Sequence, residues 1–438
     1  MNRERIYSQE GHLMLGNVDS VQLAKTYGTP LYVFDTEIIR EKAAAFKEAF
    51  SRYPVNYQIA YASKAFSTVA MVQLVDELGL ALDVVSGGEL YTALSADYPA
   101  ERIHFHGNNK SEEELRYAVK AGIGAVIVDN FYELDMLSNI AREENKIVKV
   151  MLRITPGVEA DTHAYISTGQ EDSKFGFYLT KGDAEEAFRR TIRDPQLLLI
   201  GLHFHIGSQL FTAKTHEQAI QALYEYVDQW YKTYQFLPGI INVGGGFGIR
   251  YTESDLPETP QTFIGAIVEC ILRECEQRNL KVPEIWIEPG RALVGEAGTT
   301  LYTVGSMKST REGRTYIAVD GGMTDNLRPA LYQSKYEAAI ANRFPSESEK
   351  AVTVAGKCCE SGDILIDSIE LSAVKPGDLL AVFCTGAYGY AMANNYNRLP
   401  RPAVVFVEAG EAQLVVKRES YEDLIRHDLP LKKRSQIR

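Results

Sequence analysis

From about residue 55 to 290, short apolar runs rich in β-branched residues alternate with longer amphipathic stretches. This alternation predicts βα units around a parallel sheet, with helices between the strands. Ser111–Ala121 is one expected helix, because Glu112, Glu113 and Glu114 in its first turn suit the helix dipole. Eight runs occur, which fits a (β/α)8 barrel of about 250 residues better than an open doubly wound sheet. The runs are Tyr57–Tyr61, Ala81–Val85, Ile103–Gly107, Ala125–Asp129, Val148–Ile154, Leu199–His205, Ile240–Val243 and Glu284–Glu288.

The pattern changes after residue 300, where apolar runs are separated by turn signals without long helical intervals. This change predicts a second, antiparallel β domain, which the N-terminal strand Pro30–Phe34 is expected to join. The predicted division is a barrel over residues 36–298 and a β domain over 1–35 and 299–438, with a frayed tail after Leu431. The runs of the β domain are Tyr316–Val319, Leu379–Phe383, Ala403–Val407 and Ala412–Val416.

Lys64 follows the first run of the predicted barrel, in Tyr61-Ala62-Ser63-Lys64. Barrels carry their chemistry at the carboxyl ends of the strands, so polar residues directly after each run are the first candidates. A partly desolvated lysine at this place can be neutral enough to form a Schiff base. A surface lysine is the alternative interpretation of this position by itself.

The sixth run ends among three polar residues, His203, His205 and Ser208. Period two along a strand puts the two histidines on the same face. An imidazole at the barrel mouth can lie flat on an aromatic cofactor, and Ser208 can hydrogen-bond a phosphate. Two hydrogen-bonded interior histidines are the alternative.

The seventh run is followed by Gly244, Gly245 and Gly246. Glycines let backbone N–H groups approach an anion closely, and barrels often bind phosphate in the loops after strands seven and eight. The cluster is not a dinucleotide-binding fingerprint, since Ile249 stands where the third glycine of GxGxxG belongs. A tight structural turn is the alternative for the cluster alone.

Glu288 and Arg291 follow the eighth run. The planar fork of Arg291 suits a phosphate or carboxylate, and Glu288 can keep a pyridine nitrogen protonated. An exposed ion pair is the alternative for these two alone. Lysine, imidazole, glycine loop, carboxylate and arginine together predict a pyridoxal-phosphate site. The signatures HExxH, GxxxxGK[ST] and GxSxG do not occur, so zinc protease, P-loop NTPase and α/β-hydrolase interpretations lack support.

Composition narrows the setting in which this chemistry is expected. Lys+Arg 46 against Asp+Glu 58 gives a net charge of −12, which argues against nucleic-acid and anionic-membrane partners. The 5 cysteines show neither CxxC nor zinc-ligand spacing, so we expect a reducing cytoplasm and no metal site. No stretch approaches the roughly 18 apolar residues of a membrane span, and the N-terminus lacks an export signal.

Ordered motifs along nearly the whole chain resemble diaminopimelate decarboxylases, within the barrel-fold pyridoxal-phosphate decarboxylases that also include ornithine and arginine decarboxylases. One departure is Phe66, where many relatives have asparagine. The motifs are YASKAF (61–66), DVVSGGEL (83–90), HGNNKS (106–111), GLHFHIGSQ (201–209), GGGFG (244–248), EPGR (288–291), DGGMTDNLRPALY (320–332), CCESGD (358–363) and GAYGYAMANNYN (386–397).

The resemblance implies a role for individual residues. Lys64 would hold the cofactor as a Schiff base, His205 would stack on its ring and Glu288 would pair with the ring nitrogen. Cys359 would be the proton donor, although the neighbouring Cys358 is an alternative for the inward-facing thiol. Further cofactor contacts implied are Asp83, Ser208, Gly244, Gly245, Gly246, Gly290, Arg291 and Tyr388. Substrate contacts implied are Arg291, Arg328, Tyr332, Glu360 and Tyr388.

The resemblance also implies the reaction, which is decarboxylation of meso-diaminopimelate to lysine, the last step of lysine biosynthesis, by a homodimer with shared active sites. Arg328 distinguishes this substrate, because an arginine suits a distal carboxylate and not a distal ammonium. The alternative reaction on the same fold is decarboxylation of ornithine or of a polyamine precursor such as carboxynorspermidine, and Arg328 argues against it. A non-catalytic pyridoxal-phosphate carrier and an alanine racemase, which shares the barrel-plus-β plan, are further rivals.

Overall fold

The computed structural model describes residues 5–158, 173–346 and 349–432. The chain divides into two compact units. The β unit comprises Met1–Thr36, Gly298–Thr385 and Met392–Arg438, and the barrel unit comprises Glu37–Ala297 and Gly386–Ala391. Of the tail after Leu431, for which fraying is expected, only Lys432 lies within the described residues.

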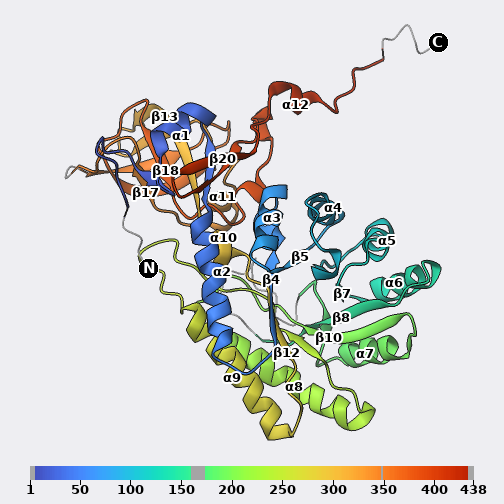
Figure 1. Cartoon of the computed structure of the whole chain (residues 1–438). Coiled ribbons are helices and arrows are strands. Elements are labelled where there is room, and N and C mark those ends of the chain that lie inside the picture. Colours follow the sequence, from blue (N-terminus) through green and yellow to red (C-terminus); the bar gives the residue numbers. More distant parts are fainter. Residues whose placement is uncertain (1–4, 159–172, 347–348, 433–438) are drawn as a thin grey trace. The chain divides into compact units, whose positions relative to one another are not determined.

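The barrel unit contains, within the described residues, eight parallel strands that close on themselves through pairing of β8 with β10. All eight predicted runs form strands of this barrel, which Figure 1 shows among the surrounding helices. A short strand, β9 (Phe177–Tyr178), pairs only with β8 in the described part of the chain. The barrel strands are β4 (Tyr57–Ala62), β5 (Ala81–Val84), β6 (Ile103–Phe105), β7 (Ala125–Val128), β8 (Val148–Thr155), β10 (Leu197–His203), β11 (Ile240–Asn242) and β12 (Glu284–Ile287).

The helices of the barrel unit alternate with these strands, as the sequence predicts. In α5, Ser111 is the N-cap, and its hydroxyl and the Glu114 carboxylate form a capping box. Gly122, at φ 73°, ends the helix in the left-handed conformation. Within the described residues, no helix combines the length and the apolar character that a membrane crossing requires. The helices are α2 (Thr36–Ser51), α3 (Val69–Glu77), α4 (Gly87–Ser95), α5 (Glu112–Ala121), α6 (Phe131–Glu143), α7 (Asp183–Arg193), α8 (Lys214–Tyr234), α9 (Pro260–Arg278) and α10 (Arg291–Val294).

The interior of the barrel is apolar near the middle of the strands and polar at their carboxyl ends. Trp286 of β12 packs with Ile127 and Met151 and stacks on His104 at 4.3 Å between ring centroids. Side chains two residues apart on a strand share a face, so Glu288 follows Trp286 on the interior side. The apolar layer therefore forms the floor beneath a polar mouth.

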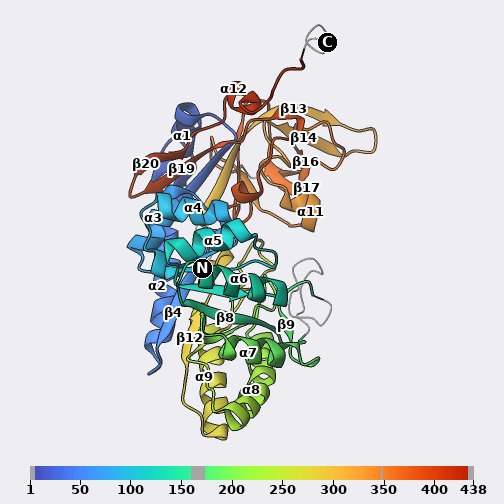
Figure 2. The ribbon, with the colours of Figure 1, turned by 90° about the vertical axis from the view of Figure 1, so that its right-hand side faces the viewer.

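The β unit is built on a seven-strand path in the order β17-β16-β14-β13-β3-β19-β20, with β18 and β15 paired beyond β13. Its strands are β3 (Leu31–Asp35), β13 (Gly298–Ser309), β14 (Thr315–Val319), β15 (Ala338–Ile340), β16 (Glu349–Ala355), β17 (Ile364–Ser372), β18 (Leu379–Val382), β19 (Ala403–Glu408) and β20 (Glu411–Val416). Figure 2 shows β13, β14, β16 and β17 side by side. A small hairpin of β1 (Met14–Leu15) and β2 (Val18–Asp19), the helix α1 (Ser20–Tyr27), α11 (Arg328–Tyr332) and α12 (Tyr421–Ile425) complete the unit.

The predicted fold class, a (β/α)8 barrel with a second β domain that the N-terminal strand joins, is confirmed. The β sheet differs from the expectation in one respect, because it is mixed. The pairs β3–β19 and β14–β16 are parallel, whereas the other pairs described in this unit are antiparallel. Strands joined by long connections can enter a sheet in either direction, so the apolar pattern of each strand carries no signal of this.

Candidate active site

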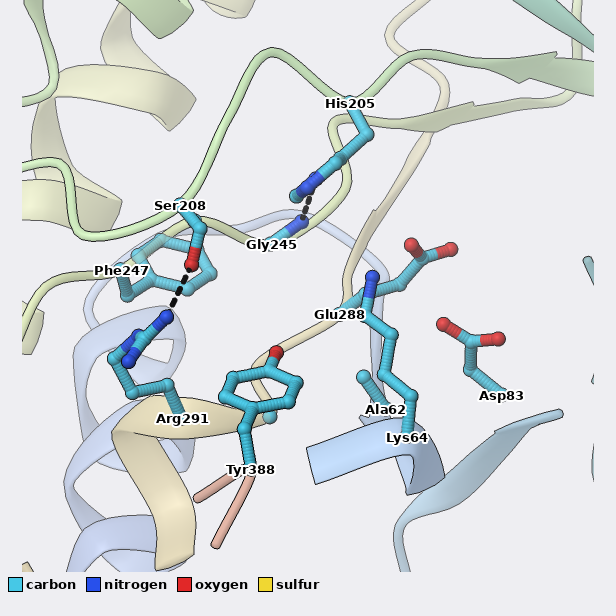
Figure 3. Close-up of a pocket in the computed structure, with 12 residues that line it drawn as sticks. Ala62, Lys64, Asp83, His205, Ser208, Gly245, Phe247, Glu288, Arg291 and Tyr388 are labelled. Carbon is cyan, nitrogen blue, oxygen red and sulfur yellow. Dashed lines mark hydrogen bonds between the residues drawn. The ribbon is translucent and has the colours of Figure 1, made fainter. Parts of the chain in front are cut away.

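A pocket at the carboxyl ends of the barrel strands brings together most of the predicted cofactor residues. The lining residues lie at the carboxyl ends of β4, β5, β10, β11 and β12 or in the loops that follow them. Tyr388 comes from the segment Gly386–Ala391 of the same unit. Gly244 lies next to the lining residue Gly245 in the chain. The pocket, shown in Figure 3, is lined by Ala62, Lys64, Asp83, His205, Ser208, Gly245, Gly246, Phe247, Glu288, Gly290, Arg291 and Tyr388.

Lys64 lies in a short 3-10 turn (Ser63–Ala65) that directly follows β4, and its side chain extends into the pocket (Figure 3). The turn is anchored by Ser63, whose hydroxyl is 2.7 Å from the Asp83 carbonyl oxygen and 2.9 Å from the Glu89 carboxylate. Tyr388 adds a backbone hydrogen bond of 2.8 Å to the Ala65 carbonyl. Lys64 is exposed, so the expected partial desolvation of this lysine is not found.

Glu288 is a buried carboxylate surrounded by hydrogen-bond donors. Asn242 Nδ2 donates to Oε1 at 2.6 Å, and His203 Nε2 lies 3.2 Å from Oε2. His106 Nε2 lies 3.0 Å from Oε1. Burial by itself raises the pKa of Glu288. The interactions with the two imidazoles lower this pKa by more than burial raises it, so the pKa of Glu288 lies well below its ordinary value.

The two imidazoles beside Glu288 are neutral near neutral pH. Burial lowers the pKa of His106 to about 3 and lowers the pKa of His203, against the attraction of Glu288 in both cases. A neutral imidazole still donates one N–H. Hydrogen bonds with the neutral His203 and with Asn242, and the His106 ring nitrogen 3.0 Å away, therefore keep the Glu288 carboxylate ionised there.

His205 occupies a different position from His203, although period two predicts a shared strand face. The strand β10 ends at His203, and His205 lies in the loop that follows. Its Nδ1 accepts the Gly245 backbone N–H at 3.2 Å. Burial, with the positive charges of Lys64 and Arg153, lowers the pKa of His205 well below its ordinary value. The ring is therefore neutral, with its proton on Nε2.

Arg291 marks the anion-binding end of the pocket. The guanidinium is buried, its Nη2 donates to the Ser208 hydroxyl at 2.9 Å, and its Nη1 donates to the Tyr251 hydroxyl. The Tyr388 ring centroid lies 4.9 Å from the guanidinium carbon. A buried guanidinium with two neutral hydroxyl partners, one of which also lines the pocket, keeps its positive charge available for a phosphate.

The glycine loop after β11 brings main chain close to main chain. A Cβ at Gly245 would overlap the Glu288 carbonyl oxygen, and one at Gly246, where φ is 102°, would lie 2.6 Å from the Gly207 carbonyl oxygen. Asn242 joins this loop to Glu288, because its Oδ1 accepts the Gly244 N–H at 2.9 Å. The loop is therefore a side-chain-free wall beside the arginine, as a phosphate cradle requires.

Two buried polar atoms fit a bound pyridoxal phosphate. Asp83 Oδ1 and Arg291 Nε have no hydrogen-bond partner among the described residues, and both residues line the pocket. Burial and the negative charge of Glu288 raise the pKa of Asp83 well above its ordinary value. Such unsatisfied groups cost stability unless a ligand completes them. A lysine, an ionised carboxylate and a phosphate wall in one pocket fit the cofactor.

Three residues near the pocket were not singled out from the sequence. His106 and Asn242 contact Glu288, and Arg153 lies 3.6 Å from the Asp129 carboxylate with its guanidinium 4.1 Å from the Phe175 ring centroid. A signal exists for each, because a polar residue within, at the end of or directly after a buried apolar run must find an interior partner. Which partner it finds depends on the closed barrel.

The remaining predicted substrate residues belong to the β unit. Arg328, at the start of α11, is buried and donates to the Tyr336 hydroxyl at 2.6 Å, and Tyr332 ends the same helix. Glu360 and Cys359 are exposed, whereas Cys358 is buried. Burial, with the negative charge of Asp363 beside it, raises the pKa of Cys358 to about 11. Cys358 is thus the packed thiol of the pair.

Residues 36–295 match the pyridoxal-binding domain of the pyridoxal-dependent decarboxylases. The chain therefore belongs to this family, as the motifs predict. The diaminopimelate decarboxylase of Bacillus subtilis is 59% identical to this chain over 97% of both sequences, and that of Halalkalibacterium halodurans is 55% identical over 98% of both.

Solved structures show the same likeness in three dimensions. The diaminopimelate decarboxylase of M. jannaschii, solved with L-lysine, is 34% identical and superimposes with a TM-score of 0.91 over 98% of both chains. The lysine/ornithine decarboxylase of Vibrio vulnificus, 21% identical over 92% of this chain and 100% of its own, shares the fold with a TM-score of 0.75. The predicted resemblance to diaminopimelate decarboxylases is confirmed.

Proposed function

We propose that this chain decarboxylates meso-diaminopimelate to L-lysine and CO2 with pyridoxal phosphate, which is the final step of lysine biosynthesis. The observation that carries the chemistry is the buried Glu288 carboxylate, kept ionised by Asn242, His106 and His203 in the pocket that Lys64 enters. The substrate follows from the similarity to diaminopimelate decarboxylases along nearly the whole chain.

The cofactor is held by the barrel unit. Lys64 would bind it covalently, Glu288 would face the pyridine nitrogen and His205 would lie against the ring. The phosphate would contact the glycine wall with Ser208 and Arg291. Gly290 leaves room at this end, because a Cβ there would lie 3.1 Å from the Ala62 Cβ. When bound, pyridoxal phosphate supplies an electron sink for the negative charge that loss of CO2 leaves on the α-carbon.

The charge on Glu288 is the main electrostatic contribution of the protein to this reaction. An ionised carboxylate favours a protonated pyridine nitrogen, and its burial makes that interaction stronger than it would be in water. The neutral donors around it matter for the same reason, since a competing positive charge would weaken its hold on that proton. The neutral His205 adds no such charge.

Substrate selection is assigned to the β unit together with Arg291 and Tyr388. Arg328 and Arg291 would clamp the distal carboxylate, Tyr332 would add a hydroxyl and Glu360 would pair with the distal ammonium. Cys359, the exposed thiol of its pair, would return a proton to the α-carbon. A substrate without the distal carboxylate would not form this ion pair with the buried Arg328 guanidinium and should be turned over much more slowly.

The proposed assembly is a homodimer with shared active sites, in which Cys359 and Glu360 of one copy serve the barrel of the other. Both side chains are exposed in the single chain, as groups that complete a partner's site must be. The spread negative charge and the free cysteines support a cytoplasmic enzyme without nucleic-acid partners.

The test is CO2 release from the pyridoxal-phosphate-loaded protein with meso-diaminopimelate, lysine or ornithine supplied separately. Release from diaminopimelate alone is expected, and release from ornithine alone would overturn the choice of substrate. Lys64→Ala should abolish release and borohydride fixation of the cofactor. Lys181→Ala is the matched control, because Lys181 is an exposed lysine of the same unit outside the pocket lining.

A further inference from the structure

Two turns of the β unit carry side chains that the proposed function assigns to substrate. The arginine turn, residues 320–328, leads into α11 and ends at Arg328. The cysteine turn, residues 356–363, carries Cys359 and Glu360 between β16 and β17. The two turns are remote in sequence, so their spacing has to be set by tertiary contacts.

One buried carboxylate, that of Asp363, bonds to both turns. Its Oδ1 accepts the backbone N–H of Met323 at 2.7 Å, and its Oδ2 accepts the backbone N–H of Cys358 at 2.8 Å. Asp363 is 2% exposed, so these bonds are shielded from competing water. Each oxygen therefore holds one turn.

Backbone hydrogen bonds continue this connection in both directions. Lys357 N–H donates to the Gly321 carbonyl at 2.9 Å, which joins the turns a second time. Asp363 N–H donates to the Glu360 carbonyl at 3.1 Å and closes the cysteine turn. Asn326 N–H donates to the Gly322 carbonyl at 2.9 Å, so the arginine turn is also folded on itself. A shift at Asp363 is thus passed to Glu360 and toward Arg328.

Glycines on both turns leave space for this carboxylate. A Cβ added at Gly322 or at Gly356 would overlap the Asp363 carboxyl group. The two glycines therefore serve a packing purpose, because any side chain at either place would push the carboxylate away from its two N–H partners.

We propose that Asp363 is a positioning residue that clamps the cysteine turn to the arginine turn and so sets the spacing of Cys359 and Glu360 from Arg328. This inference rests on the proposed function for the roles of those three side chains. The clamp itself rests only on the contacts within the β unit.

The test compares Asp363→Asn and Gly356→Ala with the control Asp378→Asn in the pyridoxal-phosphate-loaded full chain. The Asp363→Asn amide keeps one oxygen but presents an NH2 group to the other N–H, whereas Gly356→Ala displaces an intact carboxylate. Asp378 is a buried carboxylate of the same unit that accepts Lys375 N–H at 2.8 Å, pairs with Arg343 and, in the described part of the chain, bonds to neither turn. Because Asp378→Asn also weakens the Arg343 ion pair, it reports at least as large a disturbance of this unit, at a place outside the two turns.

Both clamp variants should bind the cofactor normally, because the proposed cofactor contacts all belong to the barrel unit. Their kcat/KM for diaminopimelate should fall by about 100-fold, the cost of misplacing reacting groups by roughly 1 Å. Asp378→Asn should keep the wild-type kcat/KM, even where its thermal stability is lowered as much as that of the clamp variants. Equal kcat/KM in the clamp variants and in Asp378→Asn would overturn the proposal.

A second measurement does not depend on turnover. Buried Cys358 is tethered by the clamp, so its alkylation by iodoacetamide, followed by peptide mapping, should rise by about tenfold in Gly356→Ala, which displaces the Asp363 carboxylate but keeps its charge. Protection of Cys358 in Gly356→Ala equal to that in the wild type would refute the clamp. If the wild type releases no CO2 from diaminopimelate, the proposed function fails, and the alkylation rates alone decide whether the clamp exists.

Discussion

His104 is a buried neutral histidine whose effect on the stability of this barrel at acidic pH can be measured directly. It lies on β6, stacks on Trp286 with the ring planes 13° apart, and its Nδ1 is buried without a hydrogen-bond partner among the described residues. Burial lowers the pKa of His104 to about 4, against the attraction of Glu288. Phenylalanine at this place should keep the stacking and remove the titration.

The magnitude follows from linkage between protonation and folding. The folded pKa is below the ordinary value of about 6.5, so the unfolded chain binds the proton first and stability falls as the pH drops below that value. For each state, protonation contributes a factor of 1 + 10^(pKa − pH). At about pH 5 this factor is about 30 times larger for the unfolded chain than for the folded chain, which corresponds to a loss of about 2 kcal/mol in the free energy of unfolding. At about pH 8 both factors are close to 1 and nothing is lost.

The assay is urea unfolding of the wild type and His104→Phe at about pH 8 and about pH 5. The variant should gain about 2 kcal/mol relative to the wild type between the two conditions. Phe105→Leu, a substitution of the neighbouring buried residue without a titrating group, should shift stability equally at both. A difference between wild type and His104→Phe that does not change with pH would refute the reasoning.

Three other substitutions test separate parts of the molecule. Gly245→Ala places a Cβ against the Glu288 carbonyl and should weaken pyridoxal-phosphate binding, read from cofactor absorbance in a titration; unchanged affinity would contradict the cradle. The Lys110 ammonium lies 2.8 Å from the buried Glu133 carboxylate, so Lys110→Met leaves that carboxylate without its partner. The free energy of unfolding by denaturant should fall by about 3–5 kcal/mol, and a loss no larger than that for breaking an exposed ion pair would contradict this expectation. Arg328→Ala should lose diaminopimelate turnover while keeping cofactor absorbance, and an unchanged kcat/KM would remove Arg328 from the substrate site.

Much of the barrel unit could be predicted because its signals are local. A buried strand is an apolar run of a few residues, and its carboxyl end is followed within two or three residues by the polar groups of the mouth. Lys64 after β4 and Glu288 after β12 were found in this way, and both line the pocket. The helix α5 was predicted for the same reason, since the acidic residues of its first turn are consecutive in the chain.

The contacts around those residues could not be predicted in the same way. Asn242 and His106 end or follow strands that are distant along the chain, and both reach Glu288 only because the sheet closes into a barrel. The parallel pairing of β3 with β19 joins the two ends of the chain and has no local signal either. Side-chain exposure is another example, because Lys64 proved exposed where partial desolvation was expected.

By itself, the sequence determined the order of elements, the barrel, and which chemical groups stand at the strand ends, because hydrophobic period and strand-end position are properties of neighbouring residues. Motif resemblance added the family. Only the tertiary structure decided that Glu288 lies among Asn242, His106 and His203, that Cys358 packs while Cys359 is exposed, and that Asp363 joins two remote turns. Burial and hydrogen-bond partners depend on which distant segments meet, and that depends on the closure and register of the sheets.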